Sequence, residues 1–179
     1  MSYHIKYFLV PLAEDAHGKG TIIRALVNSS GTHGNLHNKG PHALTCPCGR
    51  AFDSYVFVRS FQEVEKKDPY GNPRTVEQAL DANDPDWRQR SLIILPSHLV
   101  LVDTAQIIQL AKRNGFNVIV AHIILRQNEL PQFGPILEQE WDTRIECVNS
   151  ETDNQATRDQ QCIEIGRDLF TKLCHELCV

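Results

Sequence analysis

The stretch FNVIVAHIIL, residues 116–125, is almost uninterrupted in apolar side chains, and His122 is its one ionisable residue. Strands that are buried on both faces have this composition, and they occur mainly in parallel sheets. Upstream, SLIIL at 91–95 predicts a second buried strand closed by Pro96, and a helix is expected between the two over 104–114. A strand–helix–strand unit of this kind predicts an α/β fold with a parallel sheet.

The helix expected over 104–114 carries its apolar residues on one side, which suits packing against a sheet. Asp103 and Gln106 have the spacing of a capping box, with the carboxylate at the N-cap. Gly115 follows the last apolar turn and is the expected C-cap. The helix is therefore predicted to begin directly after Asp103.

The alternation of strands and helices continues on both sides of this unit. Periodicity and turn residues predict two more strands, over 3–12 and 52–61, and three more helices, over 19–27, 75–80 and 155–177. We therefore expect a single α/β domain over 1–179, a three-layer parallel sheet with helices on both faces.

The composition is that of a globular protein and limits the classes of function. The chain has 179 residues, is 41% hydrophobic and carries a net charge of -4, which argues against a general nucleic-acid-coating role. Its longest apolar runs are too short to cross a bilayer, and its first residues lack the pattern of a signal peptide. We therefore expect a cytoplasmic protein with no membrane partner.

The stretch VPLAEDAHGKGTIIRALV, residues 10–27, joins the first expected strand to the first expected helix. In a phosphate-binding loop, backbone N–H groups that follow a buried strand surround the phosphate, and the next helix adds its N-terminal N–H groups. A lysine ammonium neutralises the β- and γ-phosphates, and a hydroxyl group binds Mg²⁺. Lys19 between Gly18 and Gly20, followed by Thr21, supplies these groups. The alternative is a surface turn in which Lys19 is only solvated.

The segment from Ala13 to Thr21 resembles the Gly-Lys-Gly-Thr loop of adenylate kinases and other nucleoside-monophosphate kinases of the P-loop class, with Ala13 in the place of the first glycine. The resemblance implies a P-loop kinase-like fold that binds ATP or GTP with Mg²⁺ and transfers a phosphoryl group to a small molecule or a nucleotide. It implies that Lys19 neutralises the β- and γ-phosphates and that Thr21 binds Mg²⁺. The residues that it implies around the β-phosphate are Ala16, His17, Gly18, Lys19 and Gly20.

The resemblance also implies an acidic residue near the Mg²⁺. The candidate is Asp103, which follows the apolar run 99–102, while Asp53, at the start of the second strand, is a candidate for contacting a substrate hydroxyl or acting as the general base. Each has a structural alternative, because Asp53 fits a strand edge and Asp103 fits the helix cap described above. His98, after the strand at 91–95, is placed either to contact a ligand or to serve as a buried structural histidine.

A P-loop kinase further uses a cation from a mobile lid. Arg126 directly follows the strand at 116–125, at the start of a lid-like segment over about 126–146, and its alternative is a surface residue. An irregular insertion over about 28–50 is where an acceptor would bind, because long loops in compact domains tend to be functional.

Six cysteines occur in a chain without a secretion signal, so reduced thiols or a metal site are expected rather than a disulfide framework. Cys46 and Cys48 form one half of a candidate zinc site, and Cys174 and Cys178 form the other. His42 or His37 is an alternative ligand beside the first half. The competing interpretation is a set of separate reduced cysteines, with the last two packed in the core.

A second class of function stays open beside the kinase. Ala13 replaces a glycine, and Glu14 and Asp15 place two carboxylates where a polyphosphate would arrive. These features suit a P-loop-like protein that has lost catalysis and serves as a binding or regulatory protein, with a structural zinc as an optional part.

Overall fold

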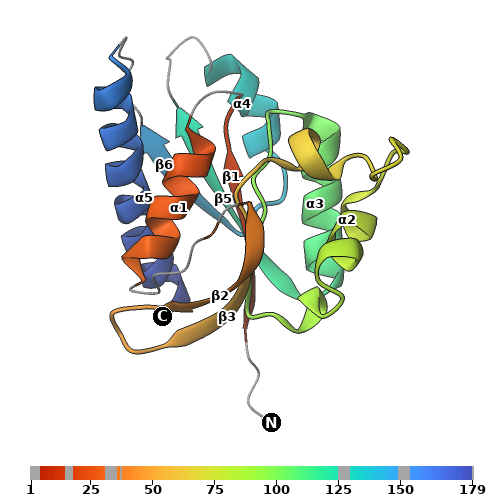
Figure 1. Cartoon of the computed structure of the whole chain (residues 1–179), viewed down its shortest axis with the longest axis horizontal. Coiled ribbons are helices and arrows are strands. Elements are labelled where there is room, and N and C mark those ends of the chain that lie inside the picture. Colours follow the sequence, from red (N-terminus) through yellow and green to blue (C-terminus); the bar gives the residue numbers. More distant parts are fainter. Residues whose placement is uncertain are drawn as a thin grey trace.

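The computed structural model describes residues 5–14, 18–30, 36, 38–124, 130–148 and 154–178. Its centre is a six-stranded sheet with the strand order β2-β3-β4-β1-β5-β6 (Figure 1). Five strands are parallel, and β2 pairs antiparallel with β3 at one edge of the sheet. The strands are β1 Lys6–Leu12, β2 Lys39–Thr45, β3 Ala51–Phe57, β4 Leu92–Ile94, β5 Phe116–Ile124 and β6 Thr143–Val148.

The central position of β1 follows from its composition. Every residue from Tyr7 to Leu12 is buried, and the strand lies between β4 and β5, both parallel to it. Its partners are apolar over most of the register, with Leu9 aligned to Ile94 on one side and to Ile119 on the other. Neither face of β1 reaches solvent, so its carboxyl end is held at a fixed place in the middle of the sheet.

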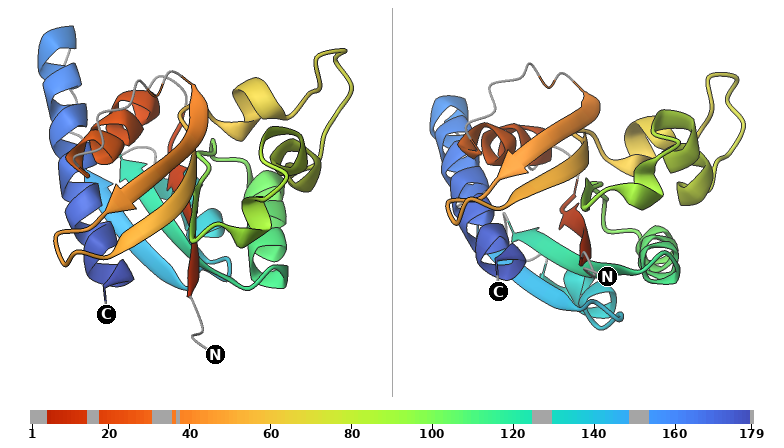
Figure 2. Two further views of the ribbon diagram at one scale, coloured as in Figure 1. Left: turned by 60° about the horizontal axis from the view of Figure 1, so that its bottom comes forward. Right: turned by 90° about the horizontal axis from the view of Figure 1, so that it is seen from below.

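Helices cover both faces of the sheet and make three layers (Figures 1 and 2). One apolar core joins the sheet to α1 and α5, and a second joins the opposite face to α2, α3 and α4. The helices are α1 Lys19–Ser29, α2 Val76–Asn83, α3 Leu101–Arg113, α4 Leu130–Leu137 and α5 Gln155–Leu177, with short turns η1 Phe61–Glu65 and η2 Trp87–Gln89. In the described residues, no helix is long and apolar enough to cross a membrane.

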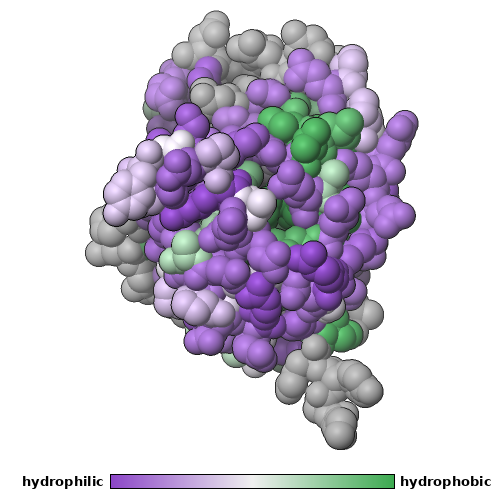
Figure 3. Space-filling model, turned by 90° about the vertical axis from the view of Figure 1, so that its right-hand side faces the viewer, coloured by the Kyte–Doolittle hydropathy of each residue, from purple (hydrophilic) through white to green (hydrophobic). Residues whose placement is uncertain are grey.

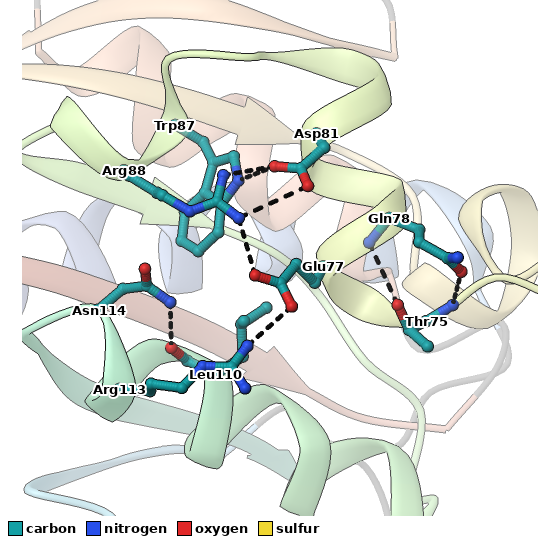
Figure 4. A network of polar contacts seen from close by, with 9 residues as sticks. All are labelled: Thr75, Glu77, Gln78, Asp81, Trp87, Arg88, Leu110, Arg113 and Asn114. Atoms are coloured by element: carbon teal, nitrogen blue, oxygen red, sulfur yellow. Dashed lines mark hydrogen bonds and ion pairs between the residues drawn. The ribbon is translucent and has the colours of Figure 1, made fainter.

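Charged side chains tie α2 to η2 and α3 on the surface of the second layer (Figure 4). Arg88 contacts Asp81 and Glu77, and the other oxygen of Glu77 accepts a 2.7 Å hydrogen bond from Arg113. Thr75 caps α2 by accepting a hydrogen bond from the backbone N–H of Gln78 at 3.2 Å. Partly exposed ion pairs contribute about 0–1 kcal/mol each, so this network orients the helices more than it stabilises them.

The three-layer α/β class with a mostly parallel sheet is confirmed, as are the strands and helices predicted around 3–12, 19–27, 75–80, 91–95, 116–125 and 155–177. Two expectations are wrong. The range 28–50 was expected to be irregular, but it contains β2, which pairs along its full length with β3. The strand expected to reach residue 61 ends at Phe57. The range expected to be lid-like, 126–146, contains α4 and the start of β6 in its described part, 130–146.

The close approach of α1 and α5 depends on Gly166. A Cβ atom at this position would lie against the backbone oxygen of Ile22 and 2.6 Å from Cβ of Ala25. Real Cβ atoms do not come this near to a backbone, so any side chain at 166 separates the two helices. The α1–α5 layer is therefore set by one backbone-to-backbone contact.

We predict that Gly166→Ala lowers the free energy of unfolding by about 1–3 kcal/mol, because overpacking outweighs the better helix propensity of alanine. The matched control is Gly134→Ala in α4, where an added Cβ meets nothing within 4 Å. The control should leave stability unchanged or raise it by up to about 1 kcal/mol. Urea unfolding of both variants checks this, and equal stability of the two would contradict the role of Gly166.

Candidate functional site

The carboxyl ends of β1 and β4 lie side by side and carry the loops of the candidate site. Beyond the two strands, Leu12 bridges to Ser97, and the backbone N–H of Ala13 donates to the oxygen of Ser97 at 3.3 Å. The chain leaves β1 towards the α1–α5 face, whereas it leaves β4 and β5 towards the opposite face. Open α/β sheets bind ligands in the crevice where neighbouring connections diverge in this way.

Lys19 lies where these connections diverge and is buried, with only 6% of its surface exposed. It is the first residue of α1, and its Nζ donates to the backbone oxygens of Ala13 and Glu14 at 2.8 and 2.6 Å. The ammonium therefore closes the loop that leads from β1 to α1. The solvated-lysine alternative does not describe this structure, because the side chain points back under the loop.

Gly18 is the N-cap of α1 and has φ of 78°, in the left-handed region. A Cβ atom there would collide with Sγ of Cys162 on α5. Both the backbone conformation and the neighbouring helix therefore require glycine at this position. The first hydrogen bond of α1 runs from the N–H of Ile22 to the oxygen of Gly18. The N–H groups before it point out of the helix end, where anions bind.

Asp103 is not the N-cap of α3, contrary to the prediction. The helix begins at Leu101 with Val100 at the N-cap, so Asp103 lies in the first turn and the run 99–102 is not a strand. Its buried carboxylate accepts hydrogen bonds from Lys66 Nζ at 2.8 and 3.0 Å and from Gln62 Nε2 at 2.9 Å. An inward-facing carboxylate needs such partners, and η1 provides them.

Gln62 connects this carboxylate to the loop after β4. Its Nε2 also donates to Oγ of Ser97 at 2.9 Å, and its Oε1 accepts from the backbone N–H of His98 at 3.0 Å. Because Ser97 bridges to the end of β1, the network reaches the start of the Lys19 loop. Neither Gln62 nor Lys66 carried a signal in the sequence, since both lie in a short turn whose position depends on the sheet.

Two histidines lie near the same edge with ring nitrogens that make no hydrogen bond within the described residues. His98 Nε2 lies 3.7 Å from an oxygen of Glu63. His122 on β5 packs edge-on against Phe133 of α4, and its Nε2 lies 3.4 Å from Glu146. Burial lowers the pKa of His122, and the nearby Glu146 carboxylate opposes this only in part.

Thr21 lines a groove between α1 and α5 with a volume of about 510 Å³. Arg24 and Arg167 line the same groove, so its wall is cationic. On the other side of the edge, Leu101 and Val102 are exposed at the start of α3, on a face that is otherwise largely hydrophilic (Figure 3). The groove therefore runs along α1 and α5 from Thr21 to Ser29, at the far end of α1.

Some predicted residues are not brought to this edge. Asp53 lies at the opposite end of the sheet, level with the start of β1, and pairs with Arg90 at 2.7 Å. Seven residues of strand separate that level from the Lys19 loop, or roughly 20 Å. Ala16, His17 and Arg126 lie outside the described residues.

The four cysteines of the candidate zinc site come together, and they do so as two disulfides. Cys46 pairs with Cys174 and Cys48 pairs with Cys178, with Cα–Cα distances of 5.5 and 6.8 Å. The expectation of reduced thiols rather than disulfides is therefore wrong for these four residues, and in the described part of the chain no three His, Cys, Asp or Glu side chains are arranged as a metal site. Cys147 is buried outside the disulfides, and burial raises its pKa to about 11, which keeps the thiol protonated.

Comparison of the chain with models of known protein families, and with curated proteins, gives no match. The assignment of a function therefore depends on the geometry of the edge at which β1 and β4 end.

We predict that Gly18→Ala costs about 2–4 kcal/mol of stability, because left-handed strain of about 1–2 kcal/mol adds to the collision with Cys162. The control is Gly71→Ala, which has φ of 87° and no atom within 4 Å of an added Cβ. It should cost only the strain, about 1–2 kcal/mol. Thermal unfolding measures both. The double variant Gly18→Ala/Cys162→Ala should recover part of the lost stability, and no recovery would contradict the contact between Gly18 and Cys162.

We also predict that His122 makes the fold less stable as the pH falls below about 6.5, the ordinary pKa of histidine. Burial lowers the pKa of His122 in the folded state, so the unfolded chain binds more protons there and stability decreases on acidification. Denaturant unfolding between pH 5 and 8 should show a flatter profile for His122→Phe. His175→Gln is the control, because that side chain is exposed at 81% and meets solvent in both states. A profile unchanged by His122→Phe would exclude this role.

Proposed function

We propose that the chain binds ATP or GTP with Mg²⁺ at the loop after β1 and transfers the terminal phosphoryl group to a small molecule or a nucleotide. The observation that carries the proposal is Lys19. A buried lysine opens a helix directly behind a loop, at the point where the connections of a parallel sheet diverge. Phosphate loops combine these same features of lysine, helix N-terminus and sheet position.

In this proposal, the polyphosphate replaces the oxygens of Ala13 and Glu14 as the partner of Lys19 Nζ. The carbonyls hold the ammonium within hydrogen-bond distance of the loop in the absence of ligand, at 2.8 and 2.6 Å. A phosphate oxygen carries more negative charge than a carbonyl, so the exchange favours the bound state. The backbone N–H groups of Gly20 and Thr21 add their dipoles from the helix end.

The hydroxyl of Thr21 is the proposed Mg²⁺ ligand, and Arg24 and Arg167 add positive charge along the same groove. The acceptor would enter from the side of Ser97, His98 and Asp103. Asp103 is held by Lys66 and Gln62, so its proposed part is to position the loop after β4 rather than to bind metal.

A second function is favoured by the same two hydrogen bonds. Lys19 pairs with carbonyls of its own loop, so a polyphosphate would have to displace both hydrogen bonds. Glu14 belongs to that loop, so the segment that would receive a polyphosphate contains a carboxylate. These observations suit a P-loop-like binding or regulatory protein without catalysis.

Thermal unfolding with Mg·ATP or Mg·GTP tests nucleotide binding. At about 100 times Kd, binding stabilises by about 2.7 kcal/mol, which raises Tm by about 5–10 °C for a chain of this size. Lys19→Met removes the charge and keeps the aliphatic stem. It should weaken nucleotide binding about 10- to 100-fold, since hydrogen bonds to charged groups contribute about 1.5–3 kcal/mol.

Lys6→Met is the matched control. Lys6 lies at the other end of β1 and also donates to two carbonyls, of Arg88 at 3.0 Å and of Asn114 at 2.6 Å. Its replacement should change stability but leave the nucleotide affinity unaltered. No shift with either nucleotide would exclude the kinase. A shift without transfer of γ-phosphate to any of a panel of nucleoside monophosphates and small alcohols would exclude the kinase and favour the binding protein.

A further inference from the structure

Four cysteines from opposite ends of the chain converge on one spot beside the lower end of α5. The turn between β2 and β3 lies against the last turns of that helix (Figure 2). Cys46 and Cys48 come from the turn, and Cys174 and Cys178 come from the helix. We call these four residues the cysteine cluster.

Each half of the cysteine cluster is held by its own backbone. In the turn, the N–H of Cys46 donates to the oxygen of Arg50 and the N–H of Gly49 donates to the oxygen of Cys46, at 2.9 and 2.8 Å. In the helix, the N–H of Cys178 donates to the oxygen of Cys174 at 3.0 Å, so the two side chains lie one turn apart on one face. These hydrogen bonds lie within each half and do not involve the sulfur atoms.

Other contacts also join the two halves. Arg50 donates from Nη1 to the backbone oxygen of Leu177 at 2.7 Å, and its guanidinium lies 5.3 Å from the ring centre of Phe52. Leu44 and Leu177 are both buried in the same apolar core. The turn therefore stays on the helix by packing and hydrogen bonding, in addition to the disulfides.

We propose that the cysteine cluster, when reduced, is a tetrathiolate site for a soft divalent metal ion, with Zn²⁺ as its ligand. Four thiolates on two backbone-fixed halves give a closed tetrahedral set, the type found in structural zinc sites. Zn–S bonds of about 2.3 Å place the sulfurs about 3.8 Å apart. The paired Cα atoms lie 5.5 and 6.8 Å apart, and once the disulfides are reduced, rotation about χ1 lets the sulfurs of each pair separate towards that spacing.

One pair of the cysteine cluster is accessible to solvent, which gives the metal ion a route to the site. Cys46 and Cys174 are buried at 2% and 6% exposure, whereas Cys48 is exposed and Cys178 is partly exposed. Reduction begins at the outer pair, and the metal enters from that side. The two disulfides take up four electrons and four protons from two molecules of a dithiol, each of which leaves as its own disulfide. Zn²⁺ then displaces the thiol protons to solvent.

The test starts from protein that has been reduced with a phosphine. The phosphine becomes its oxide and takes the oxygen atom from water, and the reagent is then removed under anaerobic conditions. Titration with Co²⁺ should produce the visible absorption bands of tetrahedral thiolate coordination at one ion per chain. Zn²⁺ should then displace Co²⁺ and abolish the bands. Thiol counting on the denatured protein verifies reduction, since all six cysteines must then react.

We choose Cys48→Ser because Cys48 is exposed, so its replacement is expected to leave the protein folded. It should weaken Zn²⁺ binding by at least about 100-fold. Loss of a group that only hydrogen-bonds to a metal ligand already weakens metal affinity by about 10- to 100-fold, and Cys48 is a ligand itself. Cys147→Ala removes a thiol from the core and should keep one metal per chain. Fully reduced, folded protein that takes up neither Co²⁺ nor Zn²⁺ would overturn the proposal and leave two structural disulfides. Metal uptake unchanged in Cys48→Ser would overturn it as well.

Discussion

The burial of β1 between two parallel strands is the constraint on which the rest of the structure depends. A strand with no solvent-facing side must be apolar throughout, and it fixes both neighbours in register, from Tyr7 with Leu92 to Leu12 with His122. At the carboxyl end of β1 the chain must turn, and it turns onto one face of the sheet. The burial of β1 therefore determines where the Lys19 loop begins, and the hydrogen bonds from Lys19 to Ala13 and Glu14 then close the loop.

The same constraint explains why a charged residue is buried at the end of an apolar strand. A turn directly after a buried strand leaves carbonyl oxygens without strand partners, and each one costs free energy if it stays unpaired. Lys19 pairs two of them, and at the opposite end of β1 Lys6 pairs the carbonyls of Arg88 and Asn114, which precede β4 and β5. Stability alone therefore accounts for a lysine at both ends, and only the helix end beside Lys19 distinguishes it as a site for anions.

Elements buried on both sides were predictable, and elements at the periphery were not. The apolar run of β5 and the long amphipathic pattern of α5 are local features that determine a strand and a helix. By contrast, β2 and β6 lie at the edges with half of their residues exposed, and α4 contains Pro135, so tertiary contacts decide all three. Asp103 has the sequence spacing of a cap, but Lys66 and Gln62 draw its carboxylate inward. The cysteine pairing is equally non-local, since 128 and 130 residues separate the partners.

Helix α5 joins the three features that carry chemistry. Its first half places Cys162 against Gly18 at the start of α1, its middle packs at Gly166 on the backbone of α1, and its last turn holds half of the cysteine cluster. The contact at Gly166 leaves no room for α5 to slide along α1, because any shift brings a side chain onto Ile22 or Ala25. Helix α5 is therefore held firmly against α1. Because α5 also lines the Lys19 loop, a change that separates its last turn from the β2–β3 turn acts on a helix that the loop contacts. Chemistry at the cysteine cluster and chemistry at the loop therefore share one mechanical support.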